Sequence, residues 1–591
     1  MEPTMMPAAA RGWTALALAA AAVALAAHVL LLWGATTPVF PYDEVTLLQM
    51  SRLLAGQDHS LVIGAGYFPG WALVIAPLWW FTSTPTTLYM ASLVVGLVVS
   101  AATVLPLAAL VRRVGLARSQ AYAVACVVLA MPAVAVQAAF SLSERLLLLA
   151  VVCLALAVQR LHERPTPARA TMLALAATAT YLVHLRALAL VAVTLVWLVL
   201  LLRRDRRSAA TGLAVLVVAG LAVHGLGVAL NLAVMDAVPT QGTGLLAALS
   251  DPAPLLMLRV LASQLWAQLV GTFGLVAVGA VAVAQAAWGA ARRRRPDPAL
   301  WLAGAIVASV LVSVLSWADP AVLYAEDWRR LDGWIYGRYL DPVATLVVAL
   351  ALALLIRRVP GRVHAWAAAA GALIVTATLL AAAPYASTWG YVTVAHVPGL
   401  APWLGLLPAE RFDEGLHLLP TLGNANRMWL WASLATAAAF ALVLALRRRP
   451  LAAVALAGLL ATAASVASDP ATDRFHASEG RVPAPVAETR AVLAEHPETR
   501  VAYVTGCAPS AGRGPVSRNY FGWWLVPAVM EGVADGSPDL ARYDLYVACE
   551  GWPGASSLDA TPVPGSLAYG SELWVRPGPV ADGLRVPDPS R

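Results

Sequence analysis

The chain carries the sequence Thr37-Pro38-Val39-Phe40-Pro41-Tyr42-Asp43-Glu44 directly after its first long apolar segment, Trp13–Trp33. That apolar segment can cross a bilayer, since a spanning helix needs about 20 apolar residues, and it lacks a convincing signal-peptide cleavage motif. Charge at membrane depth is costly and usually faces a cavity or a reacting group. The pair Asp43-Glu44 therefore predicts a catalytic base that works on a lipid-borne substrate at the mouth of the first span.

Composition places the chain in a membrane. Of its 591 residues, 60% are hydrophobic and only 12% are charged, and the mean hydropathy is +0.72. Soluble domains carry about 25% charged residues, so an ordinary soluble enzyme is excluded. The net charge of +7 comes from arginine alone, because the sequence has no lysine. These arginines do not interleave with aromatic residues, which argues against nucleic-acid binding. The Ala/Val/Leu/Arg/Pro bias is typical of a high-GC actinobacterial genome.

Thirteen segments are apolar and long enough, or nearly so, to span the membrane. They lie near residues 13–33, 86–111, 118–137, 142–160, 170–184, 187–202, 209–231, 266–290, 299–316, 337–356, 365–384, 428–446 and 451–467. Arginine closes six of them, at Arg112-Arg113, Arg160, Arg203-Arg204-Asp205-Arg206-Arg207, Arg292 to Arg295, Arg357-Arg358 and Arg447 to Arg449. Short arginine-rich loops stay in the cytoplasm, so we expect a cytoplasmic N-terminus and an external C-terminus.

The apolar segment Tyr67–Phe81 is not counted as a span. It is short, contains two prolines and ends in Trp79-Trp80-Phe81. Apolar segments of about 10–14 residues are more often interfacial or re-entrant, and tryptophan favours the headgroup level. If this segment crossed the membrane, Arg112-Arg113 would lie outside. Residues 34–85 are therefore expected to form one large external loop whose helices lie on the membrane.

Residues 469–591 are rich in Pro, Gly, Asp and Glu, which predicts a small exported α/β domain. We expect a helix at Ala484–Glu495 and strands at Val501–Thr505, Asp544–Ala548 and Glu572–Val575. Cys507 and Cys549 each lie just past a predicted strand. If those strands are parallel neighbours the two cysteines meet, and an oxidising exterior then favours a disulfide; two free buried thiols are the alternative. Cys126 and Cys153 lie within spans and are expected to be packing residues.

Asp43-Glu44, followed by a surface helix over Val45–Ala55, resembles the first-loop acidic motif of GT-C-type glycosyltransferases that depend on polyprenyl phosphate. The long first external loop with in-plane helices is similar to that family too. The alternative is a helix N-cap, because an acidic residue at a helix N-terminus complements the helix dipole. Phe68–Trp71 depart from the family, since lipid-A- and protein-modifying relatives tend to have a Lys-Pro-Pro run there. This difference weakens any transfer of their substrates.

A second element, Trp334-Ile335-Tyr336-Gly337-Arg338-Tyr339-Leu340-Asp341-Pro342, resembles the Gly-Arg-Tyr-x-x-Pro element of the same family. A guanidinium at the outer interface suits a lipid phosphate, because its fork matches two phosphate oxygens. Arg338 is therefore expected to bind the donor phosphate together with Tyr339, and Tyr336 is expected to bind the substrate. The alternative is an interfacial anchor that reaches the headgroups. The charged loop 326–330 is expected either to close over this site or to be solvated.

Further ionisable residues lie at the outer ends of spans. His184 and Arg186 interrupt the apolar stretch 170–202, which must turn at the outer leaflet because both of its ends have to be inside. Ionisable residues at such breaks usually line a cavity, and a water-exposed charged turn is the alternative. Glu144 begins the span 142–160 and is a candidate substrate-binding residue or a helix cap. Other candidate sugar contacts precede residue 428: Glu410, Asp413, Glu414, His417, Asn424 and Arg427.

Motifs of other protein classes are absent from the sequence. There is no glycine-rich phosphate loop, no dinucleotide fingerprint, and no HExxH, CxxC or paired-cysteine zinc pattern. No internal repeat of the kind found in many transporters is present. The competing classes are a lipid or sugar transporter without enzymatic activity and an inactive relative that only scaffolds envelope synthesis.

The sequence thus predicts a polytopic α-helical membrane protein of the GT-C type, with a transmembrane catalytic domain at 1–468 and an extracytoplasmic domain at 469–591. The resemblance implies that a sugar moves from a polyprenyl-phosphate donor to an envelope glycan or glycolipid at the plasma membrane, as in actinobacterial arabinosyl- and mannosyltransferases. Asp43 would take the acceptor proton while Arg338 and Arg186 stabilise the leaving phosphate, with inversion. Glu44 would hold the acceptor or a divalent cation, Mg²⁺ or Mn²⁺, or serve as the base itself.

Overall fold

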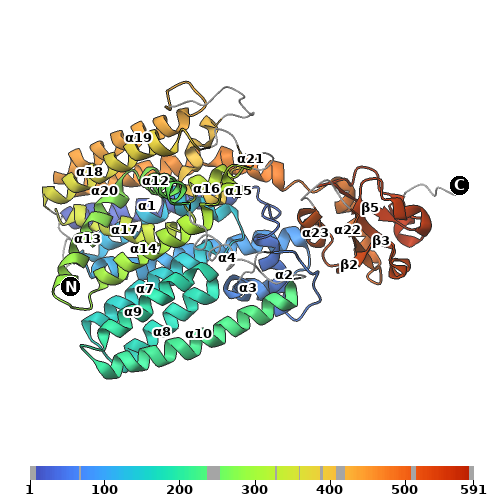
Figure 1. Ribbon diagram of the computed structural model, residues 1–591, viewed down its shortest axis with the longest axis horizontal. Coiled ribbons are helices and arrows are strands. Elements are labelled where there is room, and N and C mark those ends of the chain that lie inside the picture. The colour runs from blue at the N-terminus through green and yellow to red at the C-terminus, as the bar shows by residue number, and fades with distance from the viewer. Residues whose placement is uncertain are drawn as a thin grey trace, which may run out of the picture.

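The computed structural model describes residues 8–64, 68–235, 253–325, 329–358, 360–386, 390–407, 419–507 and 514–584. It consists of a large bundle of helices with a small α/β domain at one end (Figure 1). The apolar composition accounts for the bundle, because helices satisfy every backbone hydrogen bond internally and can therefore lie in lipid. The predicted fold class, a polytopic helical membrane protein with a small C-terminal α/β domain, is confirmed.

Within the described ranges, nine helices are long and apolar enough to cross a membrane. They are α1 (Ala8–Leu32), α4 (Pro85–Arg112), α7 (Glu144–Glu163), α10 (Arg206–Val234), α13 (Leu275–Arg292), α14 (Pro298–Trp317), α18 (Gly361–Ala377) with its continuation η4 (Thr378–Ala382), α19 (Arg427–Ala445) and α20 (Pro450–Ala467). A tenth span is reached if α5 (Arg118–Leu129) is joined to the following α6 (Pro132–Ala135) and η2 (Val136–Ala139), across a bend of 66°.

The other predicted segments are also helical, although their helices are shorter. Three of the predicted segments form shorter helices: α8 (Pro167–Val183), α9 (Leu188–Leu201) and α17 (Asp341–Ile356). The 16 residues of α17 rise about 24 Å at 1.5 Å per residue, which falls short of a hydrocarbon core of about 30 Å. His184 and Arg186 lie at the break between α8 and α9, and Asp341 is the first residue of α17. Each of these polar residues lies where an apolar run stops.

The predicted span 266–290 is wrong over residues 266–274. The chain forms α12 (Pro254–Gly271) there and breaks before α13 begins. Phe273 and Gly274 both have left-handed backbone angles, with φ of 53° and 79°. A glycine accommodates this conformation without strain, which ends the helix although the sequence stays apolar across the break.

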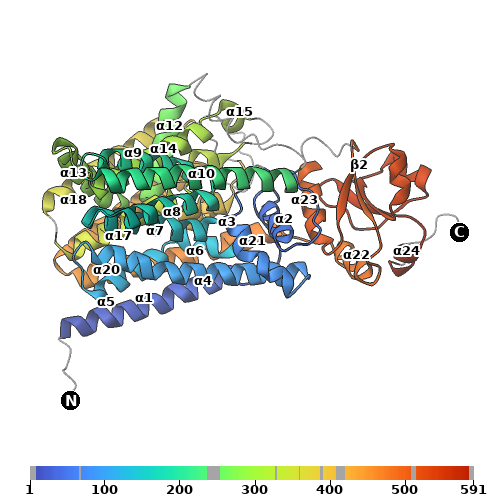
Figure 2. The ribbon, with the colours of Figure 1, turned by 90° about the horizontal axis from the view of Figure 1, so that it is seen from below.

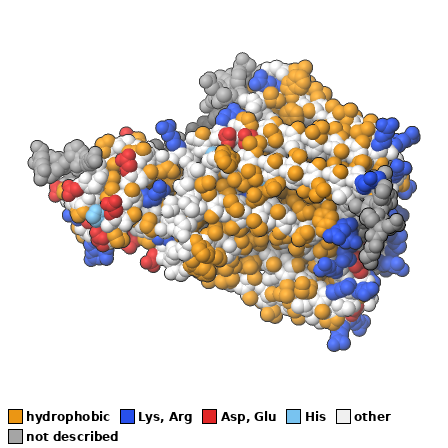
Figure 3. Space-filling view, turned by 180° about the vertical axis from the view of Figure 1, so that it is seen from behind, with side chains coloured by type: hydrophobic (Ala, Val, Ile, Leu, Met, Phe, Trp, Pro, Cys, Tyr) orange, Lys and Arg blue, Asp and Glu red, His pale blue; other side chains and the backbone are white. Residues whose placement is uncertain are grey.

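The two ends of the bundle differ in charge. On the face that Figure 3 shows, apolar side chains cover the helical body, and arginines gather at the end opposite the C-terminal domain. The arginines of the runs that the sequence placed on one side are exposed. Contacts join several of these runs to neighbouring segments: Arg113 pairs with Glu163, Arg357 donates to the Val114 carbonyl, and Arg358 donates to the Arg448 carbonyl. Helix α1 begins at the same end, and the C-terminal domain lies at the other (Figure 2).

The first loop does not cross the bundle. After α1 it forms α2 (Glu44–Leu54), then α3 (Gly70–Ile75) and η1 (Ala76–Trp80), before α4 begins. Together α3 and η1 form an apolar helix too short to span, as expected for this segment. Trp71 and Trp79 are buried, whereas Trp80 and Phe81 are 67% and 83% exposed.

The C-terminal domain is a five-stranded mixed sheet with helices. Its elements are α22 (Ala484–Glu495), β1 (Val501–Thr505), α23 (Gly514–Trp524), β2 (Met530–Ala534), β3 (Leu545–Cys549), β4 (Thr561–Pro562), β5 (Ser571–Val575) and α24 (Pro579–Gly583), in the strand order β2-β1-β3-β5-β4. The predicted helix and three strands are present at their predicted places to within one residue. β1 and β3 are parallel neighbours, and a disulfide joins Cys507 to Cys549 with Cα atoms 5.6 Å apart.

The segment between the bundle and the sheet is helical. α21 (Asp469–Glu479) continues from α20 and packs on α1 and on η6 (Pro398–Leu406). At the other side of the domain, α23 packs on α2 of the first loop. The C-terminal domain therefore contacts the first loop directly, and this contact bears on the site described next.

Candidate functional site

Four ionisable side chains from separate parts of the chain meet at the end of the bundle that carries the C-terminal domain. Arg338 donates through Nη1 to Asp43 Oδ2 at 2.6 Å, and through Nε to Glu144 Oε1. Arg186 donates through Nη2 to the same Glu144 oxygen at 2.9 Å. Two guanidiniums thus share one carboxylate, and one of them also holds a second carboxylate. The structure brings these four sequence-predicted residues together.

Each of these residues lies next to a helix end, which explains why they converge. Glu144 is the first residue of α7, and Arg186 lies in η3 (Leu185–Ala187), the break between α8 and α9. Arg338 precedes α17, and Asp43 precedes α2. Helices that begin or end at one level of the bundle present their terminal residues to the same layer. Side chains far apart in sequence therefore share one site.

The cluster is nearly closed off from solvent. The side chains of Arg338, Glu144 and Arg186 are 3%, 6% and 7% exposed, whereas that of Asp43 is 15% exposed. Burying a charge costs several kcal/mol unless an opposite charge compensates it, and here each charge has such a partner. Asp43 is the member of the cluster with the most access to solvent.

Adjacent in sequence, Asp43 and Glu44 have different environments. Glu44 is fully buried and accepts four hydrogen bonds. Its Oε2 accepts from the amides of Val39 and Phe40 at 2.8 and 3.1 Å, and its Oε1 accepts from the Ser141 amide and the Tyr89 hydroxyl at 2.6 and 2.7 Å. Burial raises the pKa of Glu44 to about 7, while these donors favour the carboxylate. Glu44 ties the first loop to α4 and to the segment before α7, and Asp43 points to Arg338.

The environment of Glu44 does not fit a metal ligand. Each of its two oxygens already accepts two hydrogen bonds from N–H or O–H groups, so neither is directed at a cation. Elsewhere in the described part of the chain, no three His, Cys, Asp or Glu side chains form a group that could hold a metal ion.

Aromatic residues line the same cluster. The Arg186 guanidinium lies over the Tyr339 ring at 5.2 Å from its centroid, and Tyr336 packs edge-on against Tyr339 at 5.0 Å. His184 accepts the Arg186 amide through Nδ1 at 3.2 Å. Burial and the nearby Arg186 charge lower the pKa of His184, which favours the neutral ring that this bond requires. Tyr339 and His184 therefore contact Arg186 directly, and Tyr336 packs on Tyr339.

A second polar network, which the sequence did not reveal, holds the Arg338 element in place. Asp332 in α16 (Leu331–Trp334) is fully buried and accepts two hydrogen bonds from Arg330, at 2.8 and 2.9 Å, and one from His396 Nδ1 at 2.8 Å. Burial opposes its ionisation, but the Arg330 and His396 partners hold the pKa of Asp332 below its usual range. The His396 carbonyl accepts the amides of Gly337 and Arg338 at 2.9 and 3.2 Å. No spacing in the sequence relates residue 332 to residue 396.

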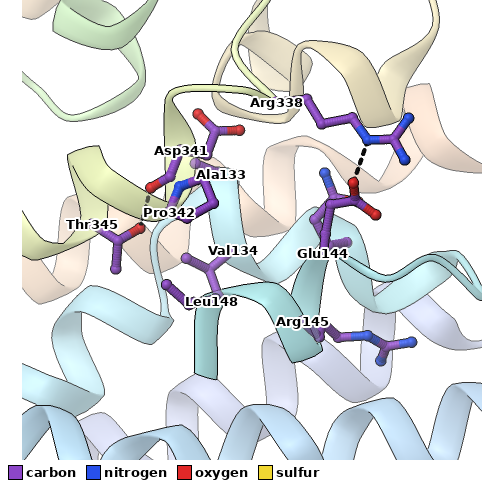
Figure 4. A pocket seen from close by; sticks show the side chains of 10 residues that line it. Ala133, Val134, Glu144, Arg145, Leu148, Arg338, Asp341, Pro342 and Thr345 are labelled. Atoms are coloured by element: carbon purple, nitrogen blue, oxygen red, sulfur yellow. Dashed lines mark hydrogen bonds and ion pairs between the residues drawn. The ribbon is translucent and has the colours of Figure 1, made fainter. Parts of the chain in front are cut away.

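Asp341 is a further buried carboxylate beside the cluster. Figure 4 shows a narrow cavity with Arg338 and Glu144 on one side and Asp341 and Thr345 across from them. Asp341 Oδ1 accepts a hydrogen bond from Gln268 Nε2 at 2.8 Å. Among the described residues, Asp341 Oδ2 and Glu144 Oε2 have no hydrogen-bond partner, so the cavity wall offers acceptors. Asp341 lies inside the quoted Arg338 element, and this position was the available signal for it.

Other candidates lie apart from the cluster. Arg145, the neighbour of Glu144, donates instead to the carbonyls of Leu93 and Phe140 at 3.1 and 3.0 Å. Asn424 and Arg427 line a separate groove with Arg474 and Phe475 of α21. Several candidates lie outside the described residues: Glu326, Asp327 and Trp328 of the charged loop, and Glu410, Asp413, Glu414 and His417.

Comparison with known proteins identifies the fold. No protein-family model and no curated protein matches the chain. The structure is similar to that of ArnT from Cupriavidus metallidurans bound to undecaprenyl phosphate, with a TM-score of 0.53 and 16% identity over 95% of this chain and 98% of ArnT. ArnT in the apo state gives a TM-score of 0.53 and 17% identity over 96% and 98%. Arabinosyltransferase EmbB from Mycobacterium smegmatis reaches 0.41 at 15% identity over 82% of this chain and 44% of EmbB, which is too low to extend the comparison. The chain therefore has the fold of ArnT along nearly its whole length.

Proposed function

We propose that the protein is a membrane glycosyltransferase that uses a polyprenyl-phosphate sugar donor. One observation carries the proposal: two buried guanidiniums, Arg338 and Arg186, converge with a partly exposed carboxylate, Asp43, at one end of a GT-C fold. Paired guanidiniums match the oxygens of a phosphate, and a carboxylate beside them can accept a proton. The ArnT structure with the same fold is bound to undecaprenyl phosphate, which supports a lipid phosphate as the ligand here.

In the proposed reaction Asp43 is the general base. Its carboxylate accepts the proton of an acceptor hydroxyl while that oxygen attacks the anomeric carbon of the donor sugar. The bond from that carbon to the phosphate oxygen breaks, and Arg338 and Arg186 stabilise the charge that develops on the leaving phosphate. A direct displacement of this kind inverts the anomeric centre. Glu44 contributes by fixing the loop that carries Asp43, and it has no free oxygen for the acceptor.

The ion pair between Arg338 and Asp43 determines whether donor binding or activation of the base comes first. Asp43 is 15% exposed and Glu144 is 6% exposed, so an arriving phosphate reaches the Asp43 side of the guanidinium first. By replacing Asp43 on Arg338, the phosphate leaves the carboxylate free to accept a proton. Glu144 stays bound to both guanidiniums and keeps them oriented. Donor binding is therefore expected to precede activation of the base.

The experiment that tests this function uses the purified chain in lipid vesicles. A radiolabelled polyprenyl-phosphate sugar and a panel of envelope glycan and glycolipid acceptors are supplied, and labelled product is measured. The expected result is transfer that disappears in Asp43→Asn, with retained binding of polyprenyl phosphate. Absence of both transfer and binding of any polyprenyl phosphate would remove the proposal.

The topology is part of the same proposal. The exposed arginine runs lie at one end of the bundle, and short arginine-rich loops stay in the cytoplasm, so the cluster and the C-terminal domain lie outside the cell. The donor is then used at the external face of the plasma membrane. An arabinosyl or mannosyl donor from an actinobacterial envelope pathway is the specific class we propose first. A reporter enzyme fused after Arg591 tests the topology, and activity restricted to the cytoplasm contradicts it.

A further inference from the structure

The C-terminal domain contacts the loop that carries Asp43, and this contact is made by α23. The side chain of Asn519 is fully buried between the domain and the first loop. Its Nδ2 donates to the Pro41 carbonyl at 2.9 Å and to the Ile63 carbonyl at 2.6 Å, and its Oδ1 accepts the Ile63 amide at 2.9 Å. One amide side chain thereby ties together the two ends of a segment that includes Asp43 and α2.

Tyr520, the next residue, makes a second bond to the same loop. Its hydroxyl donates to the Val39 carbonyl at 2.8 Å, and the residue is fully buried. The ring is held by stacking on Trp524 and Tyr569, with centroids 5.1 and 4.8 Å apart. The position of the hydroxyl is therefore set by the domain and not by the loop.

Further bonds extend the contact along α2. Gln49 donates to the Gly522 carbonyl at 3.1 Å, Arg52 donates to the Pro527 carbonyl at 2.5 Å, and Ser60 accepts the Met530 amide at 3.0 Å. Gln49 and Ser60 are fully buried. A buried polar contact without its partner costs about 1–3 kcal/mol per group, so the two surfaces are specific for one another.

The backbone of the loop is thus held from two sides. On the bundle side, Glu44 accepts the amides of Val39 and Phe40 and is fixed by Tyr89 and Ser141. On the domain side, Tyr520 and Asn519 hold the carbonyls of Val39 and Pro41. Asp43 follows within the same short segment, and its carboxylate meets Arg338. The bundle side binds the amides of this segment and the domain side binds its carbonyls, so both are needed to hold the backbone.

We infer that the C-terminal domain positions Asp43 through Asn519 and Tyr520, which act as positioning residues for the transfer step. The inference rests on the proposed function for its kinetic part. A general base must lie within hydrogen-bond reach of the proton it accepts, and a misplacement of about 1 Å can cost about 100-fold in rate. The donor phosphate contacts Arg338 and Arg186, which lie on other segments. A loosened first loop therefore lowers turnover while it leaves donor affinity unchanged.

A pair of tyrosine variants tests this in the full-length protein. Tyr520→Phe removes only the hydroxyl that bonds Val39. Tyr546→Phe is the matched control, because Tyr546 is also fully buried and its hydroxyl donates to backbone carbonyls, those of Leu540 and Tyr543, within the domain. We expect turnover to fall about three- to tenfold in Tyr520→Phe, in line with the net worth of one hydrogen bond, and to stay unchanged in Tyr546→Phe. Asn519→Ala should lower turnover about 10- to 100-fold.

Two other measurements separate positioning from stability and from the proposed function. Binding of polyprenyl phosphate should be equal in all variants. Hydrogen exchange of the Val39 and Phe40 amides should accelerate in Tyr520→Phe and Asn519→Ala but not in Tyr546→Phe. Equal turnover in the two tyrosine variants, or unchanged exchange at Val39 and Phe40, overturns the inference. If the wild type transfers no sugar, the proposed function fails, and the exchange measurement still decides whether the domain holds the loop.

Discussion

The two ends of the helical bundle both carry arginine, but the side chains are used in opposite ways. At the end away from the C-terminal domain the arginines are exposed, as Arg113 shows with 27% of its side chain accessible and Glu163 as its partner. At the other end Arg338 and Arg186 are 3% and 7% exposed, and each is bonded to a carboxylate. We expect the exposed arginines to mark the cytoplasmic side of the membrane and the buried arginines to bind the donor phosphate.

The difference follows from hydration. An exposed guanidinium keeps its water and gains little from a partner, about 0–1 kcal/mol. A buried one loses that water and needs compensating charge, so removing its partner is far more costly. A phosphate can replace a carboxylate at such a position, because both present oxygens in the geometry that the guanidinium fork matches. The comparison therefore predicts large effects at the buried end and small ones at the exposed end.

The largest effect is expected for Asp43→Asn. Asparagine also suits a helix N-terminus, so the fold should be retained. Loss of the base should lower turnover by about 10²–10⁴-fold. Donor affinity should be unchanged or tighter, because the carboxylate that competes for Arg338 is gone. Single-turnover transfer and equilibrium binding of polyprenyl phosphate measure the two quantities separately.

Glu44 provides the control for this experiment. Glu44→Gln places an NH₂ group among four donors, so we expect a less stable first loop rather than a selective loss of chemistry. If Asp43→Asn transfers sugar at the normal rate while a folded Glu44→Gln is inactive, the base is Glu44. If neither change slows transfer, the acidic pair is structural and the glycosyltransferase proposal loses its main support.

The next effect is expected for Arg338→Ala. Loss of a charge-assisted contact to phosphate should cost about 1.5–3 kcal/mol, or about 10- to 100-fold in donor affinity. Glu144 keeps Arg186 as a partner in this variant, so its charge stays compensated. Arg357→Ala is the matched control at the other end of the bundle, where Arg357 is exposed and donates to the Val114 carbonyl at 2.6 Å. Equal donor affinity in the two variants would mean that Arg338 does not bind the donor and only holds the loops together.

A smaller effect on stability is expected for Gly96→Ala in α4. A Cβ at Gly96 would lie 2.0 Å from Cζ of Arg145, whose guanidinium is buried against the glycine and bonded to two carbonyls. Displacing it should destabilise the protein by about 1–3 kcal/mol, as overpacking does. Gly220→Ala in α10 is the control, since nothing lies within 4 Å of that Cβ and alanine favours a helix over glycine by about 1 kcal/mol. Thermal unfolding that shifts equally in both variants would contradict tight packing of Arg145.

Much of the site could be predicted because its residues sit where apolar runs stop. Glu144, Arg186 and Arg338 each follow or precede a span, and the arginine runs fix which ends of the spans share a side. Residues at one level of a bundle can meet whatever their sequence separation. The helix and three of the strands of the C-terminal domain could be located for a similar reason, since each is bounded by polar or turn-forming residues.

What could not be predicted depends on contacts between distant segments. Nothing in the local sequence distinguishes Asp43 from Glu44, because the difference arises from Tyr89 in α4 and the amide of Ser141. Asn519 and Tyr520 follow no motif, and their role exists only where α23 meets the first loop. Strand β2 escaped prediction because it buries Met530 alone and contains Gly532. The break at Gly274 lies within an unbroken apolar run, so hydropathy gave no sign of it.

The smallest effect is expected at the exposed end, for the pair of Arg113 and Glu163. Their side chains are 27% and 37% exposed, and a pair of this kind contributes about 0.2–1 kcal/mol, which salt screens further. Arg113→Ala, Glu163→Gln and the double variant form a mutant cycle whose coupling energy, from thermal unfolding in detergent, should lie in that range and shrink at high salt. Transfer rate and donor affinity should equal those of the wild type. A coupling energy of several kcal/mol, or a loss of donor affinity, would contradict this prediction. Exposure would then not explain why arginines behave differently at the two ends of the bundle. The assignment of phosphate binding to the buried arginines would lose its physical basis.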